Sequence, residues 1–372
     1  MWCVIRTVYY ERDHTALLLD AIRPLVEELR HRFGLSRILV RPHWVNGPHL
    51  DLVMDADAEV FRDAIFPHGA AVLSAWLKAH PSTTVLDEAA FLEQCRAMAV
   101  IENEDRPVFP LNPNNTVLAG DYHRAAPLDI AEFGEARDDF LSDSLDVLFE
   151  VCAAARNNRG TLFRYVVGLL ASVGAVRPNG DYAFWPLSFV AHVQGFLLSN
   201  PKAGERFAAA ATKLADMITA QLLQLGLSQG TDQAPGDDAI LTRWISALRR
   251  LDERLKSLVS VHHAEINRRR FPPGVGGGAE PDVPTNLPQP PPELMSNDDV
   301  PMFKVFKTAL HMNFRFMINF VYMTLPVVTI SGAERACLCY AIAEVCMNRL
   351  PDIYARAEER MRALQREAAL LY

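Results

Sequence analysis

The sequence lacks the features that mark several large classes of protein. No stretch approaches the roughly 20 consecutive apolar residues that a membrane-spanning helix requires. The N-terminus has no basic segment followed by an apolar one, as a signal peptide would, so we expect a cytoplasmic protein that does not enter a membrane. The 372 residues carry a formal net charge of −8. This charge argues against a nucleic-acid partner, because phosphate contacts demand a basic face.

Motifs for nucleotide cofactors, common hydrolases and zinc are missing as well. The sequence has no P-loop and no dinucleotide-binding glycine pattern after a strand. It also has no G-x-S-x-G and no H-E-x-x-H. None of the six cysteines forms a C-x-x-C pair, so we expect reduced thiols in the core. The sequence therefore predicts neither a cofactor nor a metal site.

The arrangement of the apolar residues predicts an α+β fold. β-Branched and aromatic residues dominate 2–10, and two further expected strands, 37–43 and 49–54, flank an Asn-Gly turn that is typical of a hairpin. Helical periodicity appears between and after these strands, at 15–33 and 56–80. This order predicts an N-terminal antiparallel sheet with helices packed on one face, followed by a mainly helical C-terminal half.

The chain is expected to have two parts. The sheet falls within residues 1–125, and residues 126–372 are mainly helical. Within the second part, residues 271–301 are rich in proline and glycine. Such a segment buries too little apolar area to offset the entropy lost on ordering, so we expect a mobile loop there.

Candidate site residues lie beside the Asn-Gly turn. Arg41 and His43 occupy alternate positions of one expected strand, so their side chains emerge on the same face. His49 begins the next strand. An arginine and a histidine on one sheet face suit the binding and protonation of a carbonyl or carboxylate. The alternative is an ordinary polar face that contacts solvent.

Further candidates are polar residues in otherwise apolar or turn-rich segments. His192 stands in the apolar helix 187–197, where a satisfied core histidine is the alternative interpretation. His311, Asn319 and Tyr322 fall in the apolar helix 302–325, with His311 and Tyr322 three turns apart on nearly one face. Such groups need partners, which are either each other or a ligand. Asn115 precedes Tyr122 in a stretch of amides that suit peptide recognition or turn formation.

Four stretches match the motifs of a known family in order and spacing. They are VRPHWVNGPHLDL at 40–52, PSTTVLD at 81–87, NPNNTVLAGDYHR at 112–124 and SFVAHVQGFL at 188–197. On these stretches the chain resembles the lantibiotic dehydratase C-terminal-domain family, and within it the standalone pyridine synthases of thiopeptide biosynthesis. The C-terminal helix pair fits as well. Asp51, Ala191 and Gln194 depart from the family pattern.

The resemblance implies an enzyme that matures a ribosomally made peptide. Its substrate would be a precursor peptide with a leader segment and a core that holds dehydroalanines. Two dehydroalanines would join in a formal aza-[4+2] cycloaddition, and the ring would lose water and the leader, with no cofactor. The implied catalytic residues are His192, Tyr322, Glu102 and His311. Residues 1–125 would have a peptide-binding role, and the implied substrate-binding residues are Arg41, His43, His49, Asn115, Tyr122 and Asn319.

Two alternatives remain open. The first is elimination of glutamate from a glutamylated precursor that a partner dehydratase supplies. There Arg41 would hold the leaving carboxylate and His311 would act as the base, although Asp51 would repel a glutamate. The second is a non-catalytic subunit that docks a leader peptide, through a sheet edge or a helical groove.

Overall fold

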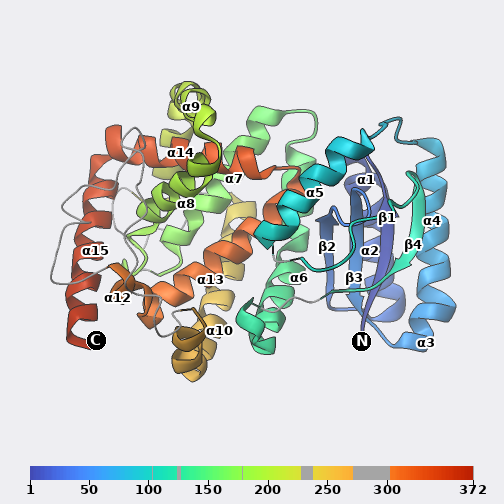
Figure 1. Cartoon of the computed structure of the whole chain (residues 1–372), viewed down its shortest axis with the longest axis horizontal. Helices are drawn as coiled ribbons and strands as arrows, with labels where there is room; N and C mark the ends of the chain where they lie inside the picture. The colour runs from blue at the N-terminus through green and yellow to red at the C-terminus, as the bar shows by residue number, and fades with distance from the viewer. Residues whose placement is uncertain (103, 124–126, 178, 228–237, 271–301, 372) are drawn as a thin grey trace. The chain divides into compact units, whose positions relative to one another are not determined.

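The protein is described here from a computed structural model, which covers residues 1–372 except 103, 124–126, 178, 228–237, 271–301 and 372 (Figure 1). The expected mobile loop at 271–301 lies outside the described residues. The chain divides into two compact units. Unit 1 consists of Met1–Ala125, Leu141–Arg156 and Pro326–Thr329. Unit 2 consists of Ala126–Phe140, Asn157–Leu325 and Ile330–Tyr372.

Unit 1 is built on a four-stranded antiparallel sheet with the strand order β2-β3-β1-β4. The strands are β1 (Trp2–Val8), β2 (Ile38–His43), β3 (His49–Asp55) and β4 (Thr116–Gly120). The helices of its first 125 residues are α1 (Thr15–Leu17), α2 (Arg23–Phe33), α3 (Ala58–Val60), α4 (Phe66–Ala79) and α5 (Glu88–Glu102). Gly34 ends α2 in the left-handed conformation, with a φ of 65°, which glycine adopts without steric cost.

Helices cover both faces of this sheet. On one face α4 approaches β1 so closely that a Cβ at Gly69 would lie 2.5 Å from Cδ1 of Ile5. On the other face Val4, Leu39 and Val53 form a buried cluster with Leu141, which belongs to helix α6 (Ala131–Ala154). The prediction of helices on one face alone was therefore wrong, because Leu141 of α6 lies 86 residues beyond the end of β3 and its contact with the sheet is not local.

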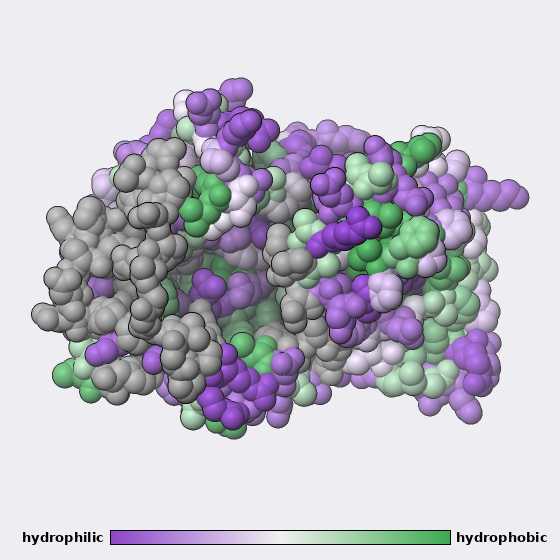
Figure 2. All heavy atoms as spheres, in the orientation of Figure 1, coloured by the Kyte–Doolittle hydropathy of each residue, from purple (hydrophilic) through white to green (hydrophobic). Residues whose placement is uncertain are grey.

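Unit 2 is almost entirely helical (Figure 1). Besides the start of α6, it contains α7 (Arg159–Ala171), α8 (Trp185–Ser199), α9 (Gly204–Gln224), α10 (Ala239–Arg270), α12 (Met302–Phe306), α13 (Ala309–Thr324), α14 (Gly332–Asn348) and α15 (Pro351–Leu371). Helix α14 packs against α8 and α9, and α10 packs against α13. Figure 2 shows hydrophilic side chains over the outer surface of α9, whose Phe207, Ile218 and Leu222 are buried.

Two kinds of polar contact fix the helices of unit 2. Thr308 caps α13, and Ser331 begins α14 with a capping box that Glu334 completes, which satisfies amide groups that would otherwise lack partners. In the interior, the carboxylate of Asp252 on α10 accepts two hydrogen bonds from Arg177, at 2.8 and 2.9 Å, and one from Tyr182. A buried carboxylate is tolerated only when it is paired in this way.

The predicted α+β class is confirmed, with an N-terminal antiparallel sheet and a mainly helical C-terminal half. The six cysteines form no disulfides, and all but Cys337 are fully buried. Within the described residues, every helix is too short or too polar to cross a bilayer.

The packing of α4 on β1 generates a stability prediction. Ile5 is 0 % exposed, so Ile5→Ala leaves a cavity beneath α4 and is expected to lower the free energy of unfolding by about 2–5 kcal/mol. Val85 is 92 % exposed, and Val85→Ala should change it by less than about 0.5 kcal/mol. Urea unfolding followed by circular dichroism measures both. Equal effects of the two substitutions would contradict the described core.

Candidate functional site

A row of charged side chains crosses three strands of the sheet in unit 1. Arg6 on β1 pairs in register with Asp51 on β3, which pairs with Arg41 on β2. Arg6 donates two hydrogen bonds to the carboxylate of Asp51, at 2.8 and 3.0 Å. The guanidinium of Arg41 lies 3.5 Å from the same carboxylate. We call Arg6, Asp51, Arg41 and the neighbouring His43 and His49 the sheet cluster.

Asp51 is fully buried and remains charged. Burial raises the pKa of its carboxyl, but the nearby ring of His49, with Nε2 at 3.5 Å, and the hydrogen bonds from Arg6 outweigh burial and hold the pKa well below its usual range. Its negative charge is therefore offset by two arginines and does not act alone. The expected repulsion between Asp51 and a substrate carboxylate is weakened for that reason.

The two histidines of the sheet cluster form the next cross-strand pair on the same face of the sheet as Arg41 and Asp51. His43 pairs in register with His49, and their ring centroids are 5.6 Å apart. Nδ1 of His49 donates to the carbonyl of Gly47 at 2.7 Å. The backbone N–H of Val45 donates to Nδ1 of His43 at 3.2 Å. Burial and the charge of Arg41 lower the pKa of His43 to about 3, so this ring is neutral near pH 7.

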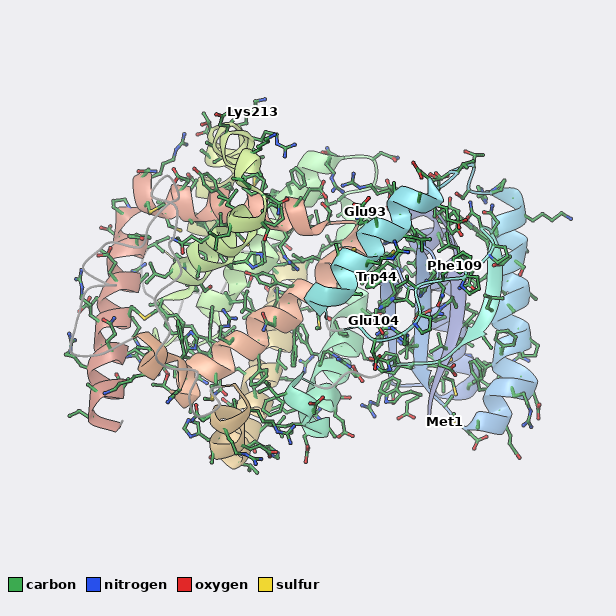
Figure 3. The ribbon with its side chains drawn as sticks, viewed as in Figure 1. Met1, Trp44, Glu93, Glu104, Phe109 and Lys213 are labelled. Atoms are coloured by element: carbon green, nitrogen blue, oxygen red, sulfur yellow. The ribbon has the colours of Figure 1, made fainter. Side chains whose placement is uncertain are left out.

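The Asn-Gly turn holds a long loop against this end of the sheet. Asn46 has a φ of 62°, and its amide donates to the carbonyls of Pro107 and Pro110 at 3.2 and 2.9 Å. The backbone N–H of Asn112 donates to the carbonyl of Asn46 at 2.8 Å. Figure 3 shows Trp44 of the turn beside Glu104 and Phe109 of this loop, with Met1 at the opposite end of the sheet. The turn thus positions the loop as well as connecting two strands.

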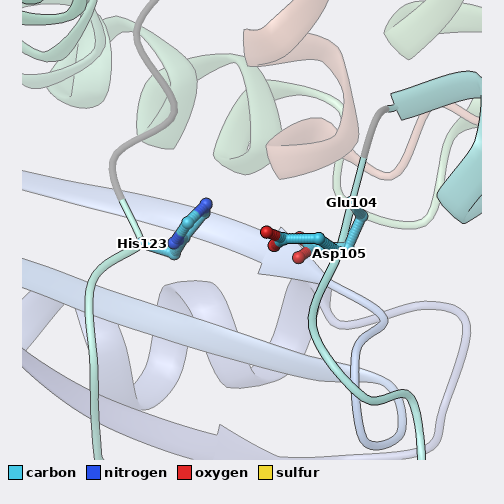
Figure 4. Close-up of side chains that lie close together, drawn as sticks. All are labelled: Glu104, Asp105 and His123. Atoms are coloured by element: carbon cyan, nitrogen blue, oxygen red, sulfur yellow. The ribbon is translucent and has the colours of Figure 1, made fainter.

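One group of side chains in the described part of the chain has the spacing of a metal site. Ligand atoms of Glu104, Asp105 and His123 all lie within 4.8 Å of one another (Figure 4). Both oxygens of Glu104 already accept hydrogen bonds from Arg106, at 2.7 and 2.5 Å. The Arg106 hydrogen bonds hold the pKa of Glu104 at about 2. Because Arg106 already pairs with the carboxylate of Glu104, we assign no metal to the group.

The other predicted residues of unit 1 have different surroundings. Tyr122 joins the sheet cluster, since the guanidinium of Arg41 lies 5.2 Å from its ring centroid. Asn115 is paired within the protein instead. Its amide accepts from the backbone of Ser82 at 2.7 Å and donates back at 2.9 Å, which is a structural use. Glu102 ends α5, and its side chain lies outside the described residues.

In unit 2 the structure brings His192 and Tyr322 together. His192 lies on α8 and Tyr322 on α13, and their ring centroids are 4.7 Å apart. The guanidinium of Arg335 on α14 lies 4.7 Å from the ring of Tyr322. We call His192, Tyr322, Arg335 and Arg315 the helical cluster, because helices α8, α13 and α14 supply it.

The protonation states in the helical cluster suit proton transfer. Burial, together with the charges of Arg335 and Arg315, lowers the pKa of His192 to about 4. Burial and the nearby thiol of Cys339, whose Sγ lies 3.8 Å from the tyrosine oxygen, raise the pKa of Tyr322 well above its usual value. Near pH 7 the histidine is thus a neutral proton acceptor and the tyrosine a protonated donor.

Arg315 and Arg335 belong to the helical cluster but were not predicted from the sequence as site residues. Arg315 precedes Tyr322 by seven residues, or about two helical turns, which places both on one face of α13. A lone arginine in an apolar helix was the available signal. Within the described residues, neither guanidinium has a carboxylate within ion-pair distance, and the Nε atom of each is buried without a hydrogen-bond partner.

Two more predicted residues lie on α13. Asn319 is exposed, on the face between Arg315 and Tyr322. His311 is buried against the rings of Phe306 and Phe184, with centroids 4.8 and 6.2 Å away. It is eleven residues from Tyr322, or about 16 Å along the helix axis, so the structure does not bring His311 into the helical cluster.

One comparison with known proteins identifies a family, and another shows a shared fold. The family model described as lantibiotic biosynthesis dehydratase C-term matches residues 2–346. Among solved structures, the pyridine synthase TbtD from thiomuracin biosynthesis superposes with a TM-score of 0.70 at 20% identity, over 94% of this chain and 99% of that one. TsrL superposes with a TM-score of 0.62 at 16% identity, over 98% of each chain. At these identities the likeness to solved structures concerns the fold. The curated proteins gave no match.

The charge row of the sheet cluster generates a second stability prediction. Asp51→Asn leaves Arg6 and Arg41 without their buried counter-charge, so the free energy of unfolding at pH 7 should fall by about 3–5 kcal/mol. The wild-type advantage should be complete above pH 3.8, the usual pKa of the group, and should shrink progressively as the pH falls from there toward the lower folded-state pKa, because the unfolded chain binds the proton first.

The matched control is Asp55→Asn, since this carboxylate is 38% exposed and also pairs with an arginine. A surface pair of this kind contributes about 1 kcal/mol or less. Urea titrations at several pH values test both variants, and a loss for Asp51→Asn no larger than that of the control would contradict the description.

Proposed function

Because the chain belongs to the lantibiotic biosynthesis dehydratase C-terminal family, we propose that it is a peptide-maturation enzyme of the pyridine synthase kind. Its substrate is a precursor peptide with a leader and a core that contains two dehydroalanines. The observation that carries the proposal is the meeting of His192 and Tyr322 in unit 2, with ring centroids 4.7 Å apart. The whole-chain similarity in fold to TbtD supports it.

The proposed reaction needs proton transfers and no oxidant. The amide that precedes one dehydroalanine passes to its iminol form, and two new carbon–carbon bonds to the second dehydroalanine close a six-membered ring without loss of atoms. The ring then loses one water and the leader, which departs as a carboxamide, and these two eliminations leave an aromatic pyridine. Holding the two alkenes in reacting geometry supplies about 7–11 kcal/mol of the barrier reduction.

The helical cluster supplies the acid and the base for these steps. Neutral His192 accepts the amide proton, and the hydroxyl of Tyr322 donates to the amide oxygen as the iminol forms. The histidine then returns its proton to a departing group, and the tyrosinate takes up a proton that a ring carbon loses during the eliminations, so both side chains are restored. The sheet cluster of unit 1 contacts the backbone of the precursor through Arg41 and His43, whereas the side chain of His49, also predicted to bind substrate, is fully buried. A glutamylating dehydratase is the partner that would supply the dehydrated core.

Glutamate elimination is the competing reaction within the family. In unit 1 Arg41 shares its charge with Asp51, at 3.5 Å, so it offers less to a leaving carboxylate than a free arginine would. In unit 2 His311 lies against phenylalanine rings. These surroundings favour cyclisation over elimination. A docking subunit would need no neutral histidine beside a protonated tyrosine.

Substitution of the pair tests the proposal. We expect His192→Ala and Tyr322→Phe each to slow conversion of a dehydrated precursor by about 10²–10⁴-fold, because each removes one proton-transfer group. The control is Tyr354→Phe, a half-buried tyrosine on α15, which should leave the rate unchanged. Mass spectrometry under single-turnover conditions measures loss of water and leader. Wild-type turnover by the double variant would refute the assignment.

The pH dependence provides an independent check. His192 accepts a proton only while neutral, so the single-turnover rate should fall about tenfold per pH unit as the pH drops below about 4. Circular dichroism at each pH establishes that the protein remains folded. An acidic limb centred near pH 6.5, the usual histidine pKa, would show that the pocket does not lower the pKa as described.

A further inference from the structure

Two arginines of the helical cluster stand apart from the other partly buried arginines of unit 2. Arg177 is bound by Asp252, and Arg360 lies 2.8 Å from Glu367. Arg315 and Arg335 are also partly buried, and the Nε atom of each is shielded from solvent. No described carboxylate, however, lies within ion-pair distance of either guanidinium. Partly buried positive charge without a counter-charge is unfavourable. Such an arrangement is typical of a site that a ligand completes.

The surroundings of the two arginines indicate what that ligand carries. The titratable groups that face His192 are Arg315 and Tyr322 on α13 and Arg335 on α14, with Cys339 next to Tyr322. Nε2 of His192 is buried and has no hydrogen-bond partner among the described residues. A neutral base, a protonated donor and two fixed positive charges therefore meet at one place. They are complementary to a group that loses a proton and gains negative charge.

We propose that Arg315 and Arg335 form an oxyanion site for the substrate amide, an inference that rests on the proposed function. When the amide N–H bond breaks, the proton passes to His192 and the electron pair delocalises onto the amide oxygen. The two guanidinium groups donate hydrogen bonds to that oxygen and lose no proton themselves. Donors placed in advance where charge develops stabilise the transition state more than the ground state.

One face of α13 carries further polar side chains beside the site. Arg315, Asn319 and Tyr322 occupy positions i, i+4 and i+7, so they share one face of the helix. Exposed Asn319 offers amide N–H donors and a carbonyl acceptor, which match the groups of a peptide backbone.

Kinetics of arginine variants test the oxyanion site. Arg315→Gln and Arg335→Gln should each lower kcat by about 10²–10³-fold, as loss of an oxyanion donor does, with KM nearly unchanged. The acidic limb of the rate should also move to higher pH, because a charge that lowers the pKa of His192 is gone. Arg315→Lys and Arg335→Lys should keep the limb in place. The control Arg362→Gln, which removes an exposed partner of Glu358, should change none of these.

A rise in KM with unchanged kcat would overturn the oxyanion assignment, since it indicates recognition of a ground-state group. An unmoved acidic limb would overturn the placement of the arginines beside His192.

A second measurement separates this inference from the proposed function, because it needs no reaction. The ring signals of His192, followed by NMR in the full-length protein, should titrate at higher pH in both glutamine variants. Added acetate should shift these signals in the wild type and leave them unmoved when both arginines are replaced. If the wild type does not cyclise peptide but acetate still shifts His192, the proposed function fails and the anion site stands. If acetate has no effect on the wild type, the site is refuted whatever the activity.

Discussion

Asp51 carries a negative charge into the interior of unit 1, where two hydrogen bonds from Arg6 and the proximity of Arg41 and His49 make that charge tolerable. The same constraint governs both clusters: a charge removed from water needs a partner. In the sheet cluster the buried carboxylate has its partners, because Arg6 and Arg41 both lie beside Asp51. Two arginines against one carboxylate leave the row with one excess positive charge.

The helical cluster meets the constraint in the opposite way. Arg315 and Arg335 have no described counter-charge, and their field is part of what keeps His192 neutral at physiological pH. The chemistry we propose depends on this imbalance. A neutral histidine can take a proton, and the positive charges that keep it neutral also stabilise the negative charge which that transfer creates. One arrangement of charge thus accounts for both the base and the oxyanion site.

Much of the fold was predictable from local patterns. β-Branched and aromatic residues located the first strand, the Asn-Gly signal located the turn between the next two, and period-2 alternation placed Arg41 and His43 on one face. The pattern did not reveal that Asn46 also holds the loop of Pro107 and Pro110, because that contact joins segments far apart in the sequence. Asp51 was recognised as a departure from the family, but its neutralisation by Arg6 depends on strand register, which the sequence did not specify.

The helical cluster was only partly predictable. Helical periodicity gives the angle between His311 and Tyr322 but not a shared environment, and the axial distance separates them. The pairing of His192 with Tyr322 followed from the resemblance to a family and not from spacing, since α8 and α13 are far apart in the chain. Arg315 lies on the same helical face as Tyr322, and its isolation in an apolar helix was a usable signal. Its lack of a counter-charge became visible only in three dimensions.

The proposed function requires that the protein close a ring between two dehydroalanines. Mass spectrometry of the wild-type protein incubated with a dehydrated, leader-bearing precursor measures this reaction. Ring closure should give two products, the leader as a free carboxamide and a core peptide whose mass is lower by that carboxamide and one water. Loss of glutamate from a glutamylated precursor, or binding of the precursor with no change in mass, would contradict it.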